Sequence, residues 1–245
     1  MPKTLKTLIL PFLCLAALSG CGGKERTITV GASSTPHAII LEKAKEYVSS
    51  QGYRLEVRVF DDYVLPNYAL EGGELDANYF QHKPYLEEFN AANGTHIVPV
   101  LDVHFEPMGV YAGRKSSLAD FGPSDLLVVP SDKSNRDRAS ALLASLGMSG
   151  ARTKEVEAQS IPLMLEDCDY AVINGNYALS SGVVGRCLAT ESKDSEAAQR
   201  MANIIAVRNG SEDSEKTRVL KDALRQEGMA EFVASSFGDS VIYLA

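Results

Sequence analysis

Short apolar runs alternate along the chain with longer amphipathic stretches. Residues 28–32 have the pattern of a strand, and apolar positions in 35–50 repeat with a helical period. Thr35 and Pro36 suit an N-cap and a first helical residue, and the Gln51-Gly52 pair predicts where this helix ends. We expect further strands at 55–60, 75–80, 97–100, 109–112, 126–130, 170–173 and 204–208, and helices at 65–70, 84–92, 135–146, 214–226 and 229–237.

This rhythm predicts an α/β architecture. Strands separated by helices of this length form mostly parallel sheets with helices on both faces. In such folds, ligands bind outside the carboxyl ends of the strands. Polar and aromatic side chains after the predicted strands are therefore the first candidates for a binding site.

The N-terminal apolar run has a different layout. Lys3 and Lys6 precede about eleven mostly apolar residues at 8–18, and small residues lead to Cys21, as in a secretory signal. The run is too short to span a bilayer. A buried strand or helix is the weaker interpretation, because Pro11 interrupts the run and two glycines follow Cys21. We predict a signal peptide at 1–20, a lipid on Cys21, and a flexible tether at 21–27.

Composition limits the classes of molecule that this chain could bind. Removing Lys3 and Lys6 with the leader leaves 22 of the 24 basic residues against 32 acidic ones, and 225 of the 245 residues remain. An acidic chain without a basic run argues against nucleic-acid binding. Cys168 and Cys187 could pair in an extracytoplasmic compartment or remain buried thiols, and spacing leaves both open.

Four predicted strands are followed by clusters of rings, amides and arginines. An arginine fork pairs with a carboxylate, amide oxygens accept from an ammonium, and rings enclose an apolar tail. These parts suit a small zwitterion, and no reaction is needed to explain them. The clusters lie at 61–67, 78–85, 130–138 and 173–177.

Several strings within and beyond these clusters resemble the NlpA-type lipoproteins, the methionine-binding components of bacterial ABC importers. The resemblance runs from about Ile28 to the C-terminus. Its strings are Asp62-Tyr63-Val64-Leu65-Pro66-Asn67, Asp76-Ala77-Asn78-Tyr79-Phe80-Gln81-His82, Pro107-Met108-Gly109, Ile173-Asn174-Gly175-Asn176-Tyr177-Ala178 and Asn203-Ile204-Ile205-Ala206-Val207.

The resemblance implies a two-lobe periplasmic-binding-protein fold, with the ligand in the cleft between the lobes. We expect lobe 1 at 28–110, with 204–245 returning to it, and lobe 2 at 111–203. The expected ligand is L- or D-methionine, delivered by a monomer to importer subunits in the membrane, without a cofactor. The resemblance places Tyr63, Phe80, His82 and Tyr85 around the ligand side chain, and Arg138, Asn174 and Asn203 on its backbone groups.

The residue types support these roles, although each residue also has an alternative interpretation. Phe80, His82 and Tyr85 lie within six residues at a strand-to-helix turn, where rings favour a thioether, although each ring alone could be core packing. His82 could instead be a metal ligand or a satisfied histidine at a helix start. We favour the helix start over the metal, because His96 and His104 lack metal-ligand spacing.

The polar candidates have alternatives as well. Arg138 could lie on an exposed charged helix face, and spacing alone favours that interpretation. Its place in the first turn after a strand favours a ligand contact near a helix N-terminus. Asn174-Gly175 could form a hairpin turn, but the helix-like residues that follow favour a strand-to-helix corner. Asn203 begins a strand that crosses between lobes, and Asn135 adds a hydrogen bond.

Some features depart from the family or limit the function. Ser131, Lys133 and Asp137 stand where the family carries asparagine, proline and glycine, and 149–158 looks shortened. Ligand choice is therefore open, with metal or another amino acid as the alternative. An enzyme is not expected, because G-x-S-x-G, P-loop and H-E-x-x-H motifs are absent. Lobe closure around the ligand is the expected mechanism.

Overall fold

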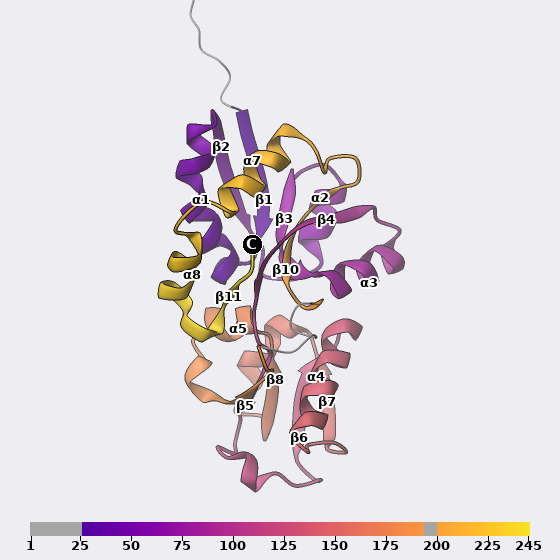
Figure 1. Cartoon of the computed structure of the whole chain (residues 1–245). Coiled ribbons are helices and arrows are strands. Elements are labelled where there is room, and N and C mark those ends of the chain that lie inside the picture. The colour runs from indigo at the N-terminus through magenta and orange to yellow at the C-terminus, as the bar shows by residue number, and fades with distance from the viewer. Residues whose placement is uncertain (1–25, 194–199) are drawn as a thin grey trace, which may run out of the picture.

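The chain folds into two lobes, each built on one β-sheet. The computed structural model describes residues 26–193 and 200–245, so the predicted cleavage site, Cys21 and nearly all of the tether lie outside the described residues. Figure 1 shows the two sheets one above the other, with α5 (Gly175–Ser180) close to the junction. The lobes meet where η1 (Ser34–Ala38) packs against α5 and where α3 (Lys83–Asn93) packs against α4 (Lys133–Ser145).

The first lobe has a six-stranded sheet in the order β11-β4-β10-β3-β1-β2. Its strands are β1 (Arg26–Ala32), β2 (Tyr53–Val59), β3 (Ala77–His82), β4 (Ile97–Phe105), β10 (Asn203–Arg208) and β11 (Ile242–Tyr243). Its helices are η1 (Ser34–Ala38), α1 (Ile39–Ser50), α2 (Leu65–Glu71), α3 (Lys83–Asn93), α7 (Glu215–Leu224), α8 (Met229–Phe237) and η5 (Gly238–Ser240).

Strand alternation places a core on each face of this sheet. Along β10, Ile205 and Val207 face the helices α1, α7 and α8, whereas Ile204 and Ala206 face Leu70 of α2 and Leu86 of α3. Neighbouring residues of a strand point to opposite faces, so an unbroken apolar run is what a strand covered on both faces requires.

The second lobe has a five-stranded sheet in the order β7-β6-β8-β5-β9. Its strands are β5 (Gly109–Ala112), β6 (Leu126–Pro130), β7 (Arg152–Val156), β8 (Tyr170–Ile173) and β9 (Cys187–Thr190). The helices are η2 (Leu118–Asp120), α4 (Lys133–Ser145), η3 (Ala158–Met164), α5 and η4 (Val184–Arg186). α4 packs on one face of the sheet, and η3 with α5 on the other.

Both sheets are mixed. β2, β1 and β3 run parallel, as do β7, β6 and β8, but β10, β4 and β11 in the first sheet and β5 and β9 in the second join by antiparallel pairing. The α/β class and the two lobes are confirmed. The sheets are less parallel than expected, because strands that follow a crossing between lobes enter their sheets in the opposite direction.

Most predicted elements are present within a few residues, with two corrections. Thr35 is not the N-cap of α1, because it lies inside η1, at a kink with an extended backbone (φ −138°, ψ 132°), and α1 begins only at Ile39. β4 continues to Phe105, five residues beyond the predicted end at 100. The short strands β7, β9 and β11 were not predicted. The expected lobe boundaries stay predictions, although β4 ends in one sheet at Phe105 and β5 begins in the other at Gly109.

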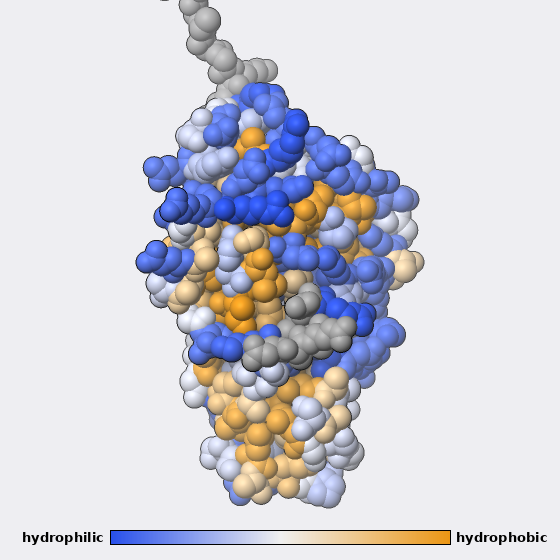
Figure 2. All heavy atoms as spheres, viewed as in Figure 1, coloured by the Kyte–Doolittle hydropathy of each residue, from blue (hydrophilic) through white to orange (hydrophobic). Residues whose placement is uncertain are grey.

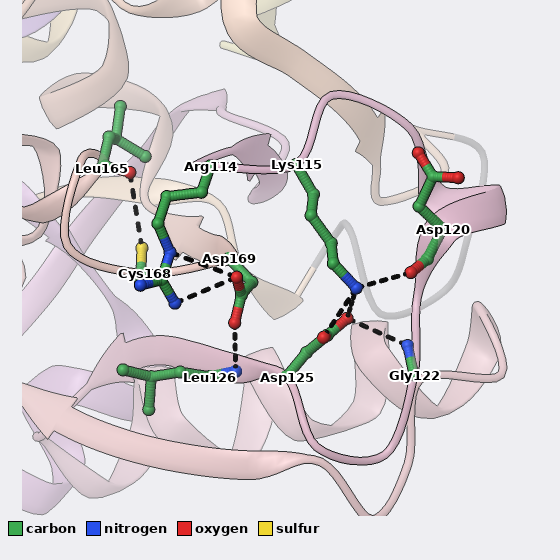
Figure 3. Close-up of polar contacts among 9 residues, drawn as sticks. All are labelled: Arg114, Lys115, Asp120, Gly122, Asp125, Leu126, Leu165, Cys168 and Asp169. Atoms are coloured by element: carbon green, nitrogen blue, oxygen red, sulfur yellow. Dashed lines mark hydrogen bonds and ion pairs between the residues drawn. The ribbon is translucent and has the colours of Figure 1, made fainter.

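Cys168 and Cys187 are unpaired thiols of the second lobe. Cys187 begins β9 and Cys168 precedes β8, and β5 lies between those strands. Figure 3 shows the Cys168 sulfur directed at the carbonyl of Leu165, beside an ion pair between Arg114 and Asp169. Burial raises the pKa of the Cys168 thiol to about 11, so it stays protonated near neutral pH.

Figure 2 shows one face of the surface, with hydrophilic residues over much of the first lobe and apolar residues gathered on the second. Within the described part of the chain, no helix combines the length and the apolar character needed to cross a bilayer.

Candidate functional site

A cavity lies between the lobes, and all eight predicted site residues line it. They come from the loop before α2, the end of β3, the first turn of α3, α4, the residue after β8 and the start of β10. Four further lining residues were not predicted. The predicted set is Tyr63, Phe80, His82, Tyr85, Asn135, Arg138, Asn174 and Asn203, and the additional residues are Gln81, Glu106, Gly175 and Asn176.

Strand ends bring these residues together. His82 at the end of β3 is the antiparallel partner of Asn203 at the start of β10, and Asn203 in turn is opposite His104 near the end of β4. In the second lobe, β6 leads into α4 and β8 leads into α5, so Asn135 and Asn174 face the same opening. Residues predicted from separate strand ends thus line one cavity.

One side of the cavity is aromatic, and its hydroxyl groups are used within the protein. The Tyr63 ring centroid lies 5.9 Å from that of Phe80 and 5.7 Å from that of Tyr85. The Tyr63 hydroxyl donates to Asn176 Oδ1 (2.6 Å), and the Tyr85 hydroxyl to the Tyr63 carbonyl (3.0 Å). Burial raises the pKa of both phenols, so they stay protonated. The lining therefore offers rings rather than polar groups to a ligand.

His82 is a helix cap. Its Nδ1 accepts from the Tyr85 backbone N–H (3.2 Å) at the start of α3, and its Nε2 donates to Asn135 Oδ1 (3.1 Å). Burial lowers the pKa of His82 to about 3, so the ring is neutral. With both nitrogens engaged, the interpretation as a satisfied histidine at a helix start is confirmed over the metal ligand. His82 presents only its ring to the cavity.

A chain of hydrogen bonds fixes the orientation of two asparagine amides. Asp132 caps α4 and accepts from Asn135 Nδ2 (2.9 Å), which turns Asn135 Oδ1 toward Asn174. Asn174 Nδ2 donates to that oxygen (2.8 Å). Asn174 Oδ1 is then a buried acceptor without a hydrogen-bond partner among the described residues. Since unpaired buried acceptors are costly, this oxygen is suited to a donor on a ligand. The strand-to-helix corner predicted here is confirmed, because Asn174 immediately precedes α5.

Asn203 is oriented by a histidine that sequence reasoning missed. His37 of η1 donates from Nε2 to Asn203 Oδ1 (3.0 Å), and both side chains are buried. With that oxygen occupied, the Asn203 amide can turn its N–H groups to the cavity. Burial lowers the pKa of His37 to about 4. His37 is therefore neutral in ordinary conditions and acts as a hydrogen-bond donor.

Arg138 is buried in the site, so its interpretation as part of an exposed helix face is wrong. It lies in the second turn of α4 rather than at the helix start, and its guanidinium lies 5.6 Å from the Phe105 ring centroid. Its Nε and Nη2 meet the carboxylate of Glu191 at 2.8 and 2.6 Å, and Nη2 also donates to the Glu106 carbonyl (2.8 Å). One edge of the fork is thus occupied, and Nη1 is the nitrogen left for a ligand.

The floor of the cavity holds a buried network around Glu106. His104 donates from Nε2 to Glu106 Oε1 (2.6 Å), and its Nδ1 is hydrogen-bonded to the Tyr79 hydroxyl. Burial raises the pKa of Glu106 to about 7 and lowers that of His104 to about 3. Together with His37, these side chains could place three ligand atoms near one point. Their contacts with one another and with Asn203 instead favour a hydrogen-bond network over a metal centre.

A profile of the NlpA lipoprotein family matches residues 28–152 and 149–244. This chain belongs to the NlpA lipoprotein family. The two matched stretches of this NlpA lipoprotein meet at 149–152, within the segment that we expect to be shortened. The join falls where the loop after α4 leads into β7, at the outer edge of the second sheet.

Named relatives of this NlpA lipoprotein include binding proteins. The methionine-binding lipoprotein MetQ of Bacillus subtilis is 31% identical, over 91% of this chain and 90% of its own length. A nutrient binding protein from Burkholderia cenocepacia, bound to methionine, superposes with a TM-score of 0.82 at 32% identity, covering 89% of this chain and all of its own. An ABC transporter periplasmic substrate-binding protein from Coxiella burnetii superposes with a TM-score of 0.82 at 29% identity, covering 89% of this chain and 100% of its own.

Proposed function

We propose that this NlpA lipoprotein captures methionine outside the cytoplasm and delivers it to an ABC importer. The observation that carries the proposal is the division of one cavity into two parts. Rings of Tyr63, Phe80 and Tyr85 form one end, where both tyrosine hydroxyls are hydrogen-bonded within the protein. Arg138 with Asn135, Asn174 and Asn203 forms the other end. A thioether gains about 0.3–1.5 kcal/mol from each contact with a ring edge, whereas a polar tail would lose hydrogen bonds there.

The polar end suits the backbone groups of an amino acid. Arg138 Nη1 and the Asn203 amide N–H groups are donors for the carboxylate. Asn174 Oδ1, the buried acceptor described above, suits the ammonium. Asn135 holds Asn174 and His82 in place and thereby links the two ends. Neither a cofactor nor a chemical step is required.

Ligand contacts on both lobes favour a closing mechanism. Phe80 and Asn203 belong to the first sheet, whereas Arg138 and Asn174 belong to the second lobe. The Tyr63 hydroxyl already bonds across the junction to Asn176 of α5. A ligand that bridges both lobes stabilises the closed form by its differential affinity, and an importer can recognise that form.

The lipid anchor is the second part of the proposal. Cys21 follows a signal-like run, and the relatives named above include lipoproteins. Tethering raises the effective concentration of the binding protein at the importer without an added contact. The described residues begin at Arg26, so the four residues 22–25 would separate them from the membrane-bound cysteine.

Isothermal titration of the protein after ligand removal tests the binding function. We expect L-methionine to bind, and glutamine, of similar length but polar, to bind at least tenfold more weakly because its amide would be buried against rings. Titration with D-methionine measures the preference of the site for one stereoisomer. Mass spectrometry of the protein purified without denaturation should identify a bound amino acid. Equal heats for methionine and glutamine, or a bound metal alone, would overturn the proposal.

A further inference from the structure

Glu106 lines the cavity but has no role in the site described so far. It lies on the segment that leads from β4 of the first lobe to β5 of the second, and the residue is 4% exposed. Its carboxylate accepts from His104 Nε2 and from the backbone N–H of Asn176, and His37 Nε2 lies 3.5 Å from its Oε1. A Cβ at Gly175 would lie 2.8–2.9 Å from the Glu106 side chain, so glycine is needed for this close approach.

The charges around Glu106 leave its carboxylate without a cation of its own. Arg138 is the nearest guanidinium, but Glu191 already binds it through two nitrogens, and only the Glu106 carbonyl accepts from it. The histidines near the carboxylate are neutral, because burial lowers the pKa values of His37 and His104 to about 4 and about 3. A buried carboxylate in these surroundings is stable as an acid or beside an incoming positive charge.

We propose that Glu106 binds the α-ammonium group of the captured amino acid and gives up one proton to solvent when the ligand enters. The inference rests on the proposed function and names the charge that this site recognises. In the step, the neutral carboxylic acid loses its proton to water and the resulting carboxylate pairs with the ligand ammonium, while Asn174 Oδ1 is the second acceptor. No covalent bond to the ligand forms or breaks.

The tyrosines and histidines around Glu106 do not change charge near neutral pH, whereas Glu106 does. Burial raises the pKa of the surrounding tyrosines and lowers that of the histidines, which keeps both kinds neutral. Burial likewise raises the pKa of Glu106 to about 7, within the range where binding would be measured. The titratable or charged groups that face it are His37 of η1, Tyr63 before α2, Tyr79 of β3, His104 of β4, Tyr111 of β5, Arg138 of α4 and Glu191 after β9.

Titration of methionine in two buffers of different ionisation enthalpy counts the protons released. We expect close to one proton at pH 6 and close to none at pH 8, with affinity about tenfold weaker at pH 6. N-acetylmethionine lacks the ammonium and should bind at least tenfold more weakly than methionine at pH 8. Methionine binding without proton release at pH 6, or N-acetylmethionine binding as tightly as methionine, would overturn the inference while leaving the proposed function intact.

Glu106→Gln keeps the shape of the side chain and removes its charge. We expect this variant to bind methionine at least tenfold more weakly at pH 8, and to lose both the proton release and the pH dependence. Glu231→Gln on the exposed side of α8 makes the same chemical change away from the cavity and should behave as the unaltered protein. Proton release that persists in Glu106→Gln would assign the proton to another group. If Glu106→Gln does not fold, the two-buffer measurement on the unaltered protein still decides.

Discussion

The Glu191 carboxylate accepts hydrogen bonds from Arg138 Nε (2.8 Å) and Nη2 (2.6 Å), and it also accepts from the Met108 backbone N–H. The arginine expected to bind a ligand is therefore already held by an internal carboxylate. Because the Arg138 side chain is 5% exposed and that of Glu191 19%, the pair is shielded from water. Glu191 positions Arg138 and balances its charge, so that Nη1 remains for the ligand.

Removing this partner should weaken both the fold and the site. Glu191→Ala leaves a buried guanidinium without its carboxylate, so we expect the free energy of unfolding to fall by about 1–3 kcal/mol and methionine affinity to fall about tenfold. Urea unfolding and calorimetric titration measure the two effects. Asp137→Asn is the matched control, since Asp137 pairs with Lys133 on the exposed face of α4 and should change neither value. Unchanged binding in Glu191→Ala would show that Glu191 does not position Arg138.

Arg138 itself should be needed for the ligand carboxylate. Arg138→Ala removes charged hydrogen bonds, and we expect a loss of about 1.5–3 kcal/mol in binding free energy. Arg138→Lys keeps the charge but lacks the planar fork that Glu191 holds, so it should restore little of the affinity. Titration of the methionine methyl ester provides the control, because a ligand without a carboxylate should lose less on either substitution. Equal losses for the acid and the ester would point to a purely structural role.

The aromatic end of the cavity should distinguish sulfur from carbon. Phe80→Leu keeps an apolar side chain of similar volume and removes the ring, which lies against Tyr63 and Tyr85. We expect methionine to lose about 0.3–1.5 kcal/mol of binding free energy, and norleucine, which has a methylene in place of sulfur, to lose less. Competition between the two ligands measures the ratio directly. A constant ratio would mean that the pocket selects shape alone.

Sequence patterns predicted the parts of this fold that follow from strong local rules. Continuous apolar runs identified β1, β6, β8 and β10, since strands covered on both faces have that composition. β7 lies at the edge of its sheet with mostly exposed residues, and β11 is two residues long, so neither carries an apolar signal. The helix start predicted at Thr35 was wrong because the chain first forms η1, kinked at Thr35, and the regular helix begins only at Ile39.

The site residues likewise divide into those that a sequence pattern indicated and those that it did not. Most of the predicted residues, Phe80 and Asn174 among them, lie at a strand end or within the next few residues, where α/β folds place ligands. Glu106 directly follows Phe105 at the end of the mostly apolar stretch 97–105 and precedes Pro107-Met108, and an acidic residue in that place was a usable signal of a buried functional charge. Glu191 and His37 gave no signal, because their partners Arg138 and Asn203 are distant in sequence and only the folded chain brings them together.

Three buried neutral histidines should make the protein sensitive to acid. Burial lowers the pKa values of His37, His82 and His104 to about 4, 3 and 3, below the ordinary value of 6.5. Below pH 6.5 the unfolded chain therefore binds protons that the folded protein does not. Their stabilisation is complete above pH 6.5 and is lost as the pH falls toward the folded values.

Protonation of Glu106 opposes this loss of folding stability in part of the pH range. Its pKa is raised to about 7, so protonation of the folded protein between pH 7 and about 4.5 recovers stability at about 1.4 kcal/mol per pH unit. Each histidine costs about the same per unit below pH 6.5, so three outweigh one carboxyl, and a net loss of about 3 kcal/mol is expected between pH 6 and pH 5.

Urea unfolding of the ligand-free protein at pH 7.5, 6 and 5 measures this loss. His104→Gln keeps a donor toward Glu106 and removes one titrating ring, so its stability should fall less steeply with pH, by about 1.4 kcal/mol per unit. His96, which is exposed and pairs with Glu71 at the surface, offers the matched control, and His96→Gln should retain the steep dependence. A stability that stays level from pH 7.5 to 5 would mean that the three buried rings accept protons in the folded state, and that the network beneath the cavity opens to water.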